Sequence, residues 1–101
     1  MDFYIFDQET HEIKLVDNHT WARWFEDDDN RRIKRTELPN GVMISTVFLG
    51  IEHLGGMFET MAFNNEGQEY QERCYTYKEA LEMHERMCNL FISVIPENNE
   101  N

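Results

Sequence analysis

The chain has only two cysteines among its 101 residues, few basic residues and no long apolar run. Cys74 and Cys88 are too few for a disulfide framework, and their separation matches no zinc-binding pattern. No stretch approaches the roughly 20 apolar residues that a membrane-spanning helix needs. The first residues lack the basic segment and the apolar core of a secretory signal, which predicts a cytoplasmic protein.

Motifs of several enzyme classes are also absent. The sequence contains no GxSxG nucleophile elbow, no phosphate-binding P-loop, no GxGxxG fingerprint, no CxxC pair and no HExxH zinc helix. It contains no internal repeat and no low-complexity segment. These absences favour a non-enzymatic protein without a cofactor.

Acidic residues dominate the charge, with 20 Asp and Glu against nine Lys and Arg and a net charge of −11. Such a chain repels nucleic acid and anionic membranes and favours basic protein surfaces. We therefore expect a protein partner with a basic surface, no direct nucleic-acid contact and no membrane. The other interpretation is that the charge serves solubility alone.

Short runs of alternating and β-branched residues predict an α+β fold. The turn sequences Pro39-Asn40-Gly41 and Asn64-Asn65-Glu66-Gly67 indicate tight hairpins. The expected strands cover residues 3–6, 13–16, 32–38, 42–51, 57–63 and 68–75. We predict an antiparallel sheet of five to six strands and two helices, with the C-terminal helix packed across one sheet face. Residues 1–95 form the single domain, and residues 96–101 form a disordered tail.

The first predicted helix is short. Asp17 or Asn18 caps it, Trp21 and Trp24 lie on its apolar face, and it should stop near Asp27. The two tryptophans are either core residues or anchors for a partner.

The second predicted helix is the clearest element of the sequence. Thr76 and Glu79 form a capping box that opens it, and Pro96 ends it. Its apolar stripe contains a histidine, and consists of Ala80, Leu81, His84, Met87, Cys88, Phe91 and Ile95.

Four polar residues form a candidate site. Glu59 lies between methionines on a strand face that looks buried, and His84 lies in the apolar stripe of the last helix. A buried carboxylate and a buried imidazole both need partners, so we predict a contact between them, with Arg73 or Tyr75 nearby. His53, in a glycine-flanked turn, could join them. The group is a satisfied core network, a metal site or an acid–base site.

Acidic side chains form the candidate partner-binding surface, with Trp21 or Trp24 as anchors. Spaced along a surface, they could imitate a phosphate backbone; otherwise they are a solvated face. The residues are Asp27, Asp28, Asp29, Glu79, Glu82 and Glu85. The first three could instead pair with the basic run at residues 31–35.

The phrases ISTVFLGIEH, MFETMAF and YTYKEALEMHERM together resemble a group of small phage and prophage proteins of no known activity. The resemblance covers Trp21 and residues 42–87, with a shorter loop after His53 than in that group. It implies a phage protein in an infected bacterial cell. Because small acidic phage proteins often bind host machinery, we expect an inhibitor that occupies a basic nucleic-acid-binding surface, such as that of a CRISPR-type nuclease complex.

Two alternatives stay open at this point. One is a small metal-binding or hydrolytic domain that uses His53, Glu59 and His84. The other is a phage structural or assembly factor. A homodimer is compatible with each of these hypotheses.

Overall fold

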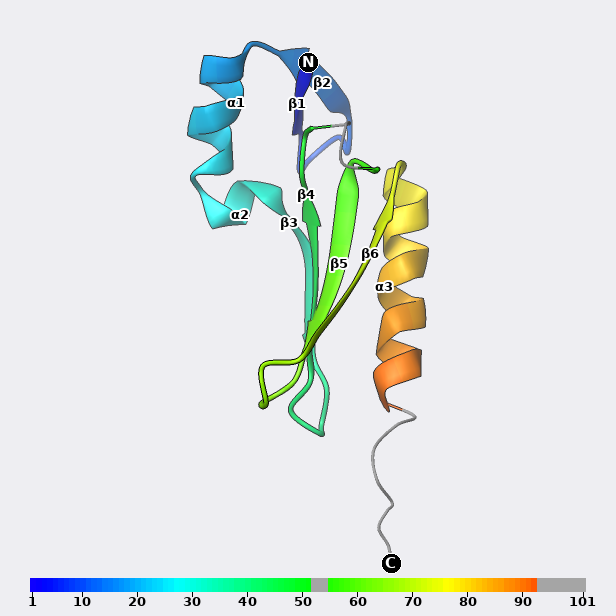
Figure 1. Cartoon of the computed structure of the whole chain (residues 1–101). Coiled ribbons are helices and arrows are strands. Elements are labelled where there is room, and N and C mark those ends of the chain that lie inside the picture. Colours follow the sequence, from blue (N-terminus) through cyan, green and yellow to red (C-terminus); the bar gives the residue numbers. More distant parts are fainter. Residues whose placement is uncertain (52–54, 93–101) are drawn as a thin grey trace, which may run out of the picture.

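The computed structural model describes residues 1–51 and 55–92 (Figure 1). In these ranges the chain forms six strands and three helices, which confirms the α+β class. The strands are β1 (Phe3–Phe6), β2 (Ile13–Val16), β3 (Arg32–Glu37), β4 (Met43–Phe48), β5 (Phe58–Phe63) and β6 (Glu69–Cys74). The helices are α1 (Asn18–Phe25), α2 (Asp28–Arg31) and α3 (Tyr77–Ile92). His53 and the predicted tail at residues 96–101 lie outside the described residues.

The strands form two sheets rather than the single predicted sheet. β3, β4, β5 and β6 follow one another in a four-stranded antiparallel sheet, and β1 and β2 form a separate hairpin. The hairpin meets the larger sheet through a bridge between Phe3 and Ile51 and a 3.0 Å hydrogen bond from the Tyr4 amide to the Gly50 carbonyl. This limited pairing is why the hairpin is a separate element.

Helix α3 covers one face of the four-stranded sheet (Figure 1). The predicted capping box is present, because the Glu79 amide donates to the Thr76 hydroxyl at 3.1 Å and the Glu79 carboxylate accepts from the Thr76 amide at 3.0 Å. Ion pairs join the helix to both edge strands. Lys34 of β3 lies 3.2 Å from Glu85, and Glu72 of β6 lies 2.9 Å from Arg86.

The sheet face covered by α3 is not the predicted one. Phe58, Thr60 and Ala62 of β5 are buried on the α3 side, so Glu59 lies on the opposite face. The prediction failed because the opposite face also carries large apolar side chains, and strand alternation alone does not show which face a helix covers. β4 alternates buried and half-buried residues along its length, so α3 covers only one of its faces.

The core between α3 and the sheet has two apolar clusters with polar residues between them. In the sheet register the Thr46–Thr60 row lies between the Phe48–Phe58 row and the Ile44–Ala62 row. The clusters are Phe6, Phe48, Met57, Phe58 and Ala80, and Leu38, Val42, Ile44, Ala62 and Met87. The intervening row places two hydroxyl groups beneath the middle of α3, where His84 lies.

Candidate functional site

His84 is fully buried, and both of its ring nitrogens are hydrogen-bonded. Nδ1 lies 2.7 Å from the Thr46 hydroxyl, and Nε2 lies 2.9 Å from the Thr36 hydroxyl. The Thr46 hydroxyl also lies 2.5 Å from that of Thr60. These four side chains, from α3, β3, β4 and β5, form a single network that we call the His84 network.

The partners in the His84 network are suited to a neutral imidazole. A neutral ring offers one donor and one acceptor, and each threonine hydroxyl can act as either. Burial lowers the pKa of His84, and the charge of Lys34 lowers it further. The ring is therefore uncharged at neutral pH. It is held inside the core with no exposed surface, so in this arrangement it bonds protein groups rather than a substrate.

Glu59 does not contact His84, which corrects the sequence-based prediction. It lies opposite Arg73 in the register of β5 and β6, on the face away from α3. One carboxylate oxygen lies 2.8 Å from Arg73 Nη2 and 3.0 Å from Nε. The expected proximity of Glu59 and Arg73 is thus confirmed, whereas Thr36, Thr46 and Thr60 are the partners of the histidine. Sequence reasoning missed these threonines, because their positions depend on strand register.

The separation of Glu59 from His84 gives a direct test. We expect Glu59→Gln and His84→Gln to lower the free energy of unfolding additively, within about 0.5 kcal/mol, because the two side chains share no partner. Glu59→Gln and Arg73→Gln should be clearly non-additive, since either substitution already breaks the same ion pair. Urea denaturation of the single and double variants measures both cycles. Coupling between Glu59 and His84 as strong as that with Arg73 would contradict the arrangement.

The two tryptophans are packed into the protein, as in the core interpretation of the sequence. Trp24 meets Phe48 edge-on, with 5.7 Å between ring centroids. Trp21 stacks on Phe25 at 4.7 Å, and its indole nitrogen donates to the Leu49 carbonyl at 3.2 Å. Both are partly buried, so their principal contacts are within the fold and the proposed anchor role has no support from their placement.

Most of the predicted acidic contact residues also have structural roles. Asp27 caps α2, and its carboxylate accepts from the Asp29 amide at 2.9 Å. Asp28 pairs with Arg31, and Asp29 pairs with Arg32 at 2.9 Å, which agrees with the expected pairing to the basic run. Asp28 and Asp29 nevertheless keep 69% and 81% of their side-chain surface exposed.

The acids of α3 differ among themselves. Glu79 belongs to the capping box, and hydrogen bonds from the backbone amides of Thr76 and Tyr75 lower its pKa. Glu85 pairs with Lys34. Glu82 is exposed and makes no ion pair with any described residue.

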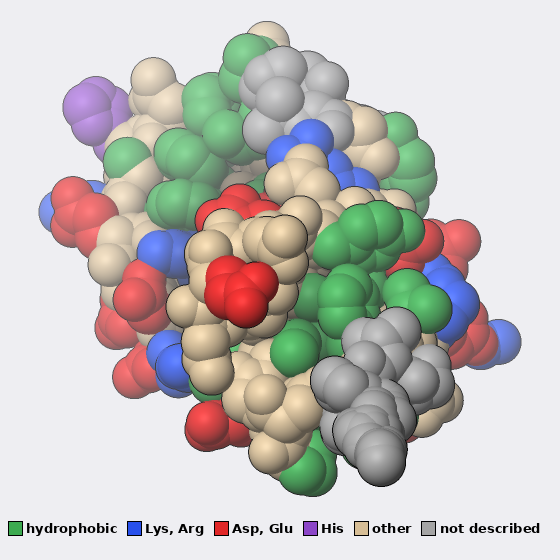
Figure 2. All heavy atoms as spheres, turned by 60° about the horizontal axis from the view of Figure 1, so that its bottom comes forward, with side chains coloured by type: hydrophobic (Ala, Val, Ile, Leu, Met, Phe, Trp, Pro, Cys, Tyr) green, Lys and Arg blue, Asp and Glu red, His purple; other side chains and the backbone are tan. Residues whose placement is uncertain are grey.

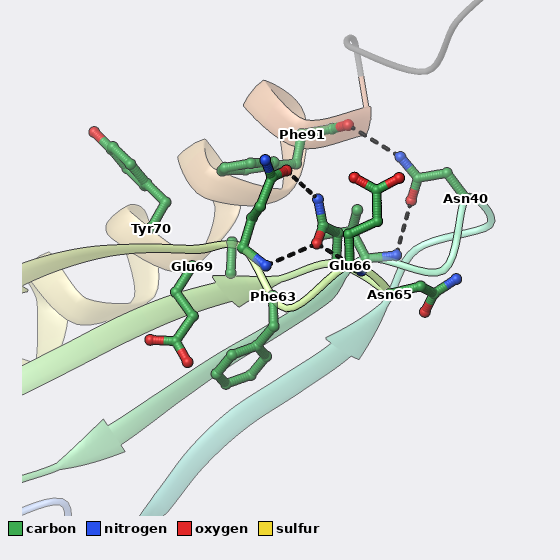
Figure 3. Close-up of a pocket in the computed structure, with 11 residues that line it drawn as sticks. Asn40, Phe63, Asn65, Glu66, Glu69, Tyr70 and Phe91 are labelled. Carbon is green, nitrogen blue, oxygen red and sulfur yellow. Dashed lines mark hydrogen bonds between the residues drawn. The ribbon is translucent and has the colours of Figure 1, made fainter.

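A pocket of about 450 Å³ opens at the end of the sheet where the hairpin turns meet the end of α3 (Figure 3). Its wall includes the ring of Phe91, and the Asn40 side-chain amide donates to the Phe91 carbonyl at 3.2 Å. Glu66 and Glu69 also contribute to its lining, although the Glu69 side chain points away from Phe91 toward the other sheet face (Figure 3). Figure 2 shows hydrophobic side chains gathered at this end of the molecule with acids around them. Sequence reasoning missed this pocket, because two distant turns and a helix end form it together.

The described residues contain no group of three His, Cys, Asp or Glu side chains that could hold a metal ion. Within the same ranges, every helix is too short or too polar to cross a membrane. No protein-family model, no curated protein and no solved structure matches the chain.

Proposed function

We propose that this chain is a non-enzymatic binding protein that uses its acidic exterior to occupy a basic, nucleic-acid-binding surface of a host protein complex. The resemblance to small phage proteins supports a setting in the cytoplasm of an infected bacterium. A CRISPR-type nuclease complex is the kind of partner that this chemistry suits, because such complexes hold nucleic acid in positively charged channels.

The excess of unpaired carboxylates is the observation that carries the proposal. Seventeen acidic residues and all nine Lys and Arg lie in the described ranges, and six ion pairs each use one acid and one base. Eleven carboxylates and three basic side chains in these ranges are therefore outside ion pairs. The net negative field is thus exposed to a partner and can steer association with a basic surface.

The closed polar network favours binding over catalysis. His84 and its three threonine partners satisfy one another inside the core. Glu59 is held by Arg73 on the other sheet face. Among the described residues that the sequence suggested for chemistry, Glu59 and His84 thus lie on opposite faces of the sheet and do not converge on one reacting atom.

Capture from a bacterial lysate tests the proposal. The tagged chain should retain a nucleic-acid-binding complex at roughly 0.05 M salt and release most of it at about 0.5 M, because salt screens surface charge. The double variant Glu26→Gln, Glu82→Gln should retain severalfold less, since both acids are exposed and outside ion pairs. The captured complex should also lose its affinity for DNA.

Lys78→Gln is the control, because it removes an exposed positive charge from α3, whereas the acidic substitutions remove negative charges. It should retain at least as much partner as the unmodified chain. Retention that is independent of both salt and the acidic substitutions would contradict the proposal. So would a captured complex that still binds DNA with full affinity.

A further inference from the structure

The four-stranded sheet has a second face that α3 does not cover. Figure 1 shows α1 and α2 beside this face only toward the end nearest β1 and β2. Its middle carries half-buried side chains from β4 and β5, namely Met43, Ser45, Val47, Met61 and Phe63. We call this surface the open face.

Charge is distributed unevenly along the open face. The strand pairings define a row that runs from Glu37 through Met43 and Phe63 to Glu69, so acids occupy both ends of this row. The next row begins with Arg35 and continues through Ser45 and Met61. Beyond it lie Arg31 and Arg32, which with Arg35 and Asp28 line a hollow of about 260 Å³ on this face. One end of the face is therefore acidic, and the other end carries Arg35 beside the ion pairs of Arg31 with Asp28 and of Arg32 with Asp29.

Three of these charges make no ion pair within the described residues. Arg35 is exposed, and its Nε lies 3.2 Å from the Met43 sulfur rather than from a carboxylate. Glu37 and Glu69 are likewise exposed and outside ion pairs. These side chains are available to a partner without loss of any intramolecular ion pair.

We propose that the open face binds a second copy of this chain. A two-fold axis that reverses the strand direction lays the acidic end of one copy over the arginine end of the other, so Glu37 of each copy meets Arg35 of its partner. The half-buried Met43, Met61 and Phe63 then pack between these charges. A two-fold axis along the strands would instead set Glu37 of each copy against Glu69 of its partner, which places like charges together. Charge complementarity thus selects a second copy and its orientation.

The area of the open face sets the expected strength of this dimer. Four strands about 4.8 Å apart and six residues long present at most roughly 400 Å² per copy, or about 800 Å² in total, which is below the roughly 1,000 Å² of a stable specific interface. We therefore expect a weak, reversible dimer that forms as concentration rises. The dimer uses neither the acids of α3 nor those near α2, so a negative result for the dimer would leave the proposed function unaffected.

Charge reversal measured by sedimentation equilibrium tests the dimer. The unmodified chain should dimerise as its concentration rises to the millimolar range. Arg35→Glu and Glu37→Arg should each weaken dimerisation by roughly tenfold or more, because each places like charges together twice. The combined variant R35E/E37R should recover, since the swapped copy is again self-complementary. An equimolar mixture of the two single variants should form mixed dimers, although neither variant dimerises well alone.

The controls are Lys78→Glu and Glu82→Arg, which make the same charge changes at exposed positions of α3. Both should dimerise like the unmodified chain, and circular dichroism should show that every variant is folded. A chain that stays monomeric into the millimolar range would overturn the proposal. So would a dimer that neither single reversal weakens, or a mixture that does not recover. A dimer abolished only by Leu15→Lys would place the interface on the small hairpin, where Leu15 is 65% exposed, and would also overturn it.

Discussion

Replacing Gly50 with alanine is expected to lower the free energy of unfolding by about 3 kcal/mol. Gly50 has a φ angle of +78°, which L side chains rarely adopt, and its added Cβ would lie 2.3 Å from the Tyr4 carbonyl oxygen and 2.5 Å from Trp21 Nε1. Neither neighbour can move freely, because the Gly50 carbonyl accepts from the Tyr4 amide and the Trp21 indole donates to Leu49. Urea denaturation followed by tryptophan fluorescence measures the loss.

Gly67→Ala is the matched control for this substitution. Gly67 has a nearly identical φ of +80°, but its added Cβ would meet nothing within 4 Å. It should therefore cost only the backbone strain, about 1 kcal/mol. The difference between the two variants isolates the close packing of β1 and α1 against the end of β4. Equal losses would mean that this junction does not hold the small hairpin and α1 to the sheet.

Local sequence signals were reliable because their physics is local. The N-cap of α1 at Asp17 and the capping box at Thr76 and Glu79 depend on contacts within three residues, and both are present. The two predicted hairpin turns are likewise present, with β3 paired to β4 and β5 paired to β6. α2 was missed because Asp27 was expected to end a helix, whereas its carboxylate caps the next one.

The candidate site could not be predicted, because it depends on which sheet face the helix covers. Strand β5 has apolar residues on both faces, so alternation places Glu59 and Thr60 on opposite sides without showing which side is inner. Helix periodicity did place His84 on the buried face of α3, and the structure confirms this. To predict the threonine partners of His84, one would need the strand register, which sets Thr46 opposite Thr60. A periodic pattern thus predicts which residues are buried, whereas the contacts between them depend on the register of the sheet.

The His84 network leads to the second large effect. Thr46→Val is expected to lower the free energy of unfolding by about 3 kcal/mol at neutral pH, because it leaves the Thr60 hydroxyl and His84 Nδ1 buried without their partner. Valine has nearly the volume of threonine, so packing changes little and the loss reports hydrogen bonding. Urea denaturation monitored by circular dichroism gives the value. Ser45→Ala is the matched control, since it removes a hydroxyl from the other face of β4, and it should cost less than about 0.5 kcal/mol.

The pH dependence of stability distinguishes this network from simple packing. Burial lowers the pKa of His84 below its ordinary 6.5, so the unfolded chain takes up a proton first as the pH falls. The stability contribution is therefore complete above pH 6.5 and should fall by up to about 1.4 kcal/mol per pH unit below it, down to the folded pKa. The groups that face the ring are the neutral hydroxyls of Thr36, Thr46 and Thr60. The charge of Lys34 lowers the pKa of His84, and the charge of Glu85 raises it by less. His84→Gln should remove this dependence between pH 6.5 and about pH 5, above the range in which carboxylates titrate. The other histidines remain in the variant and cancel in the comparison, so equal slopes in both proteins would show that His84 is not a buried neutral ring.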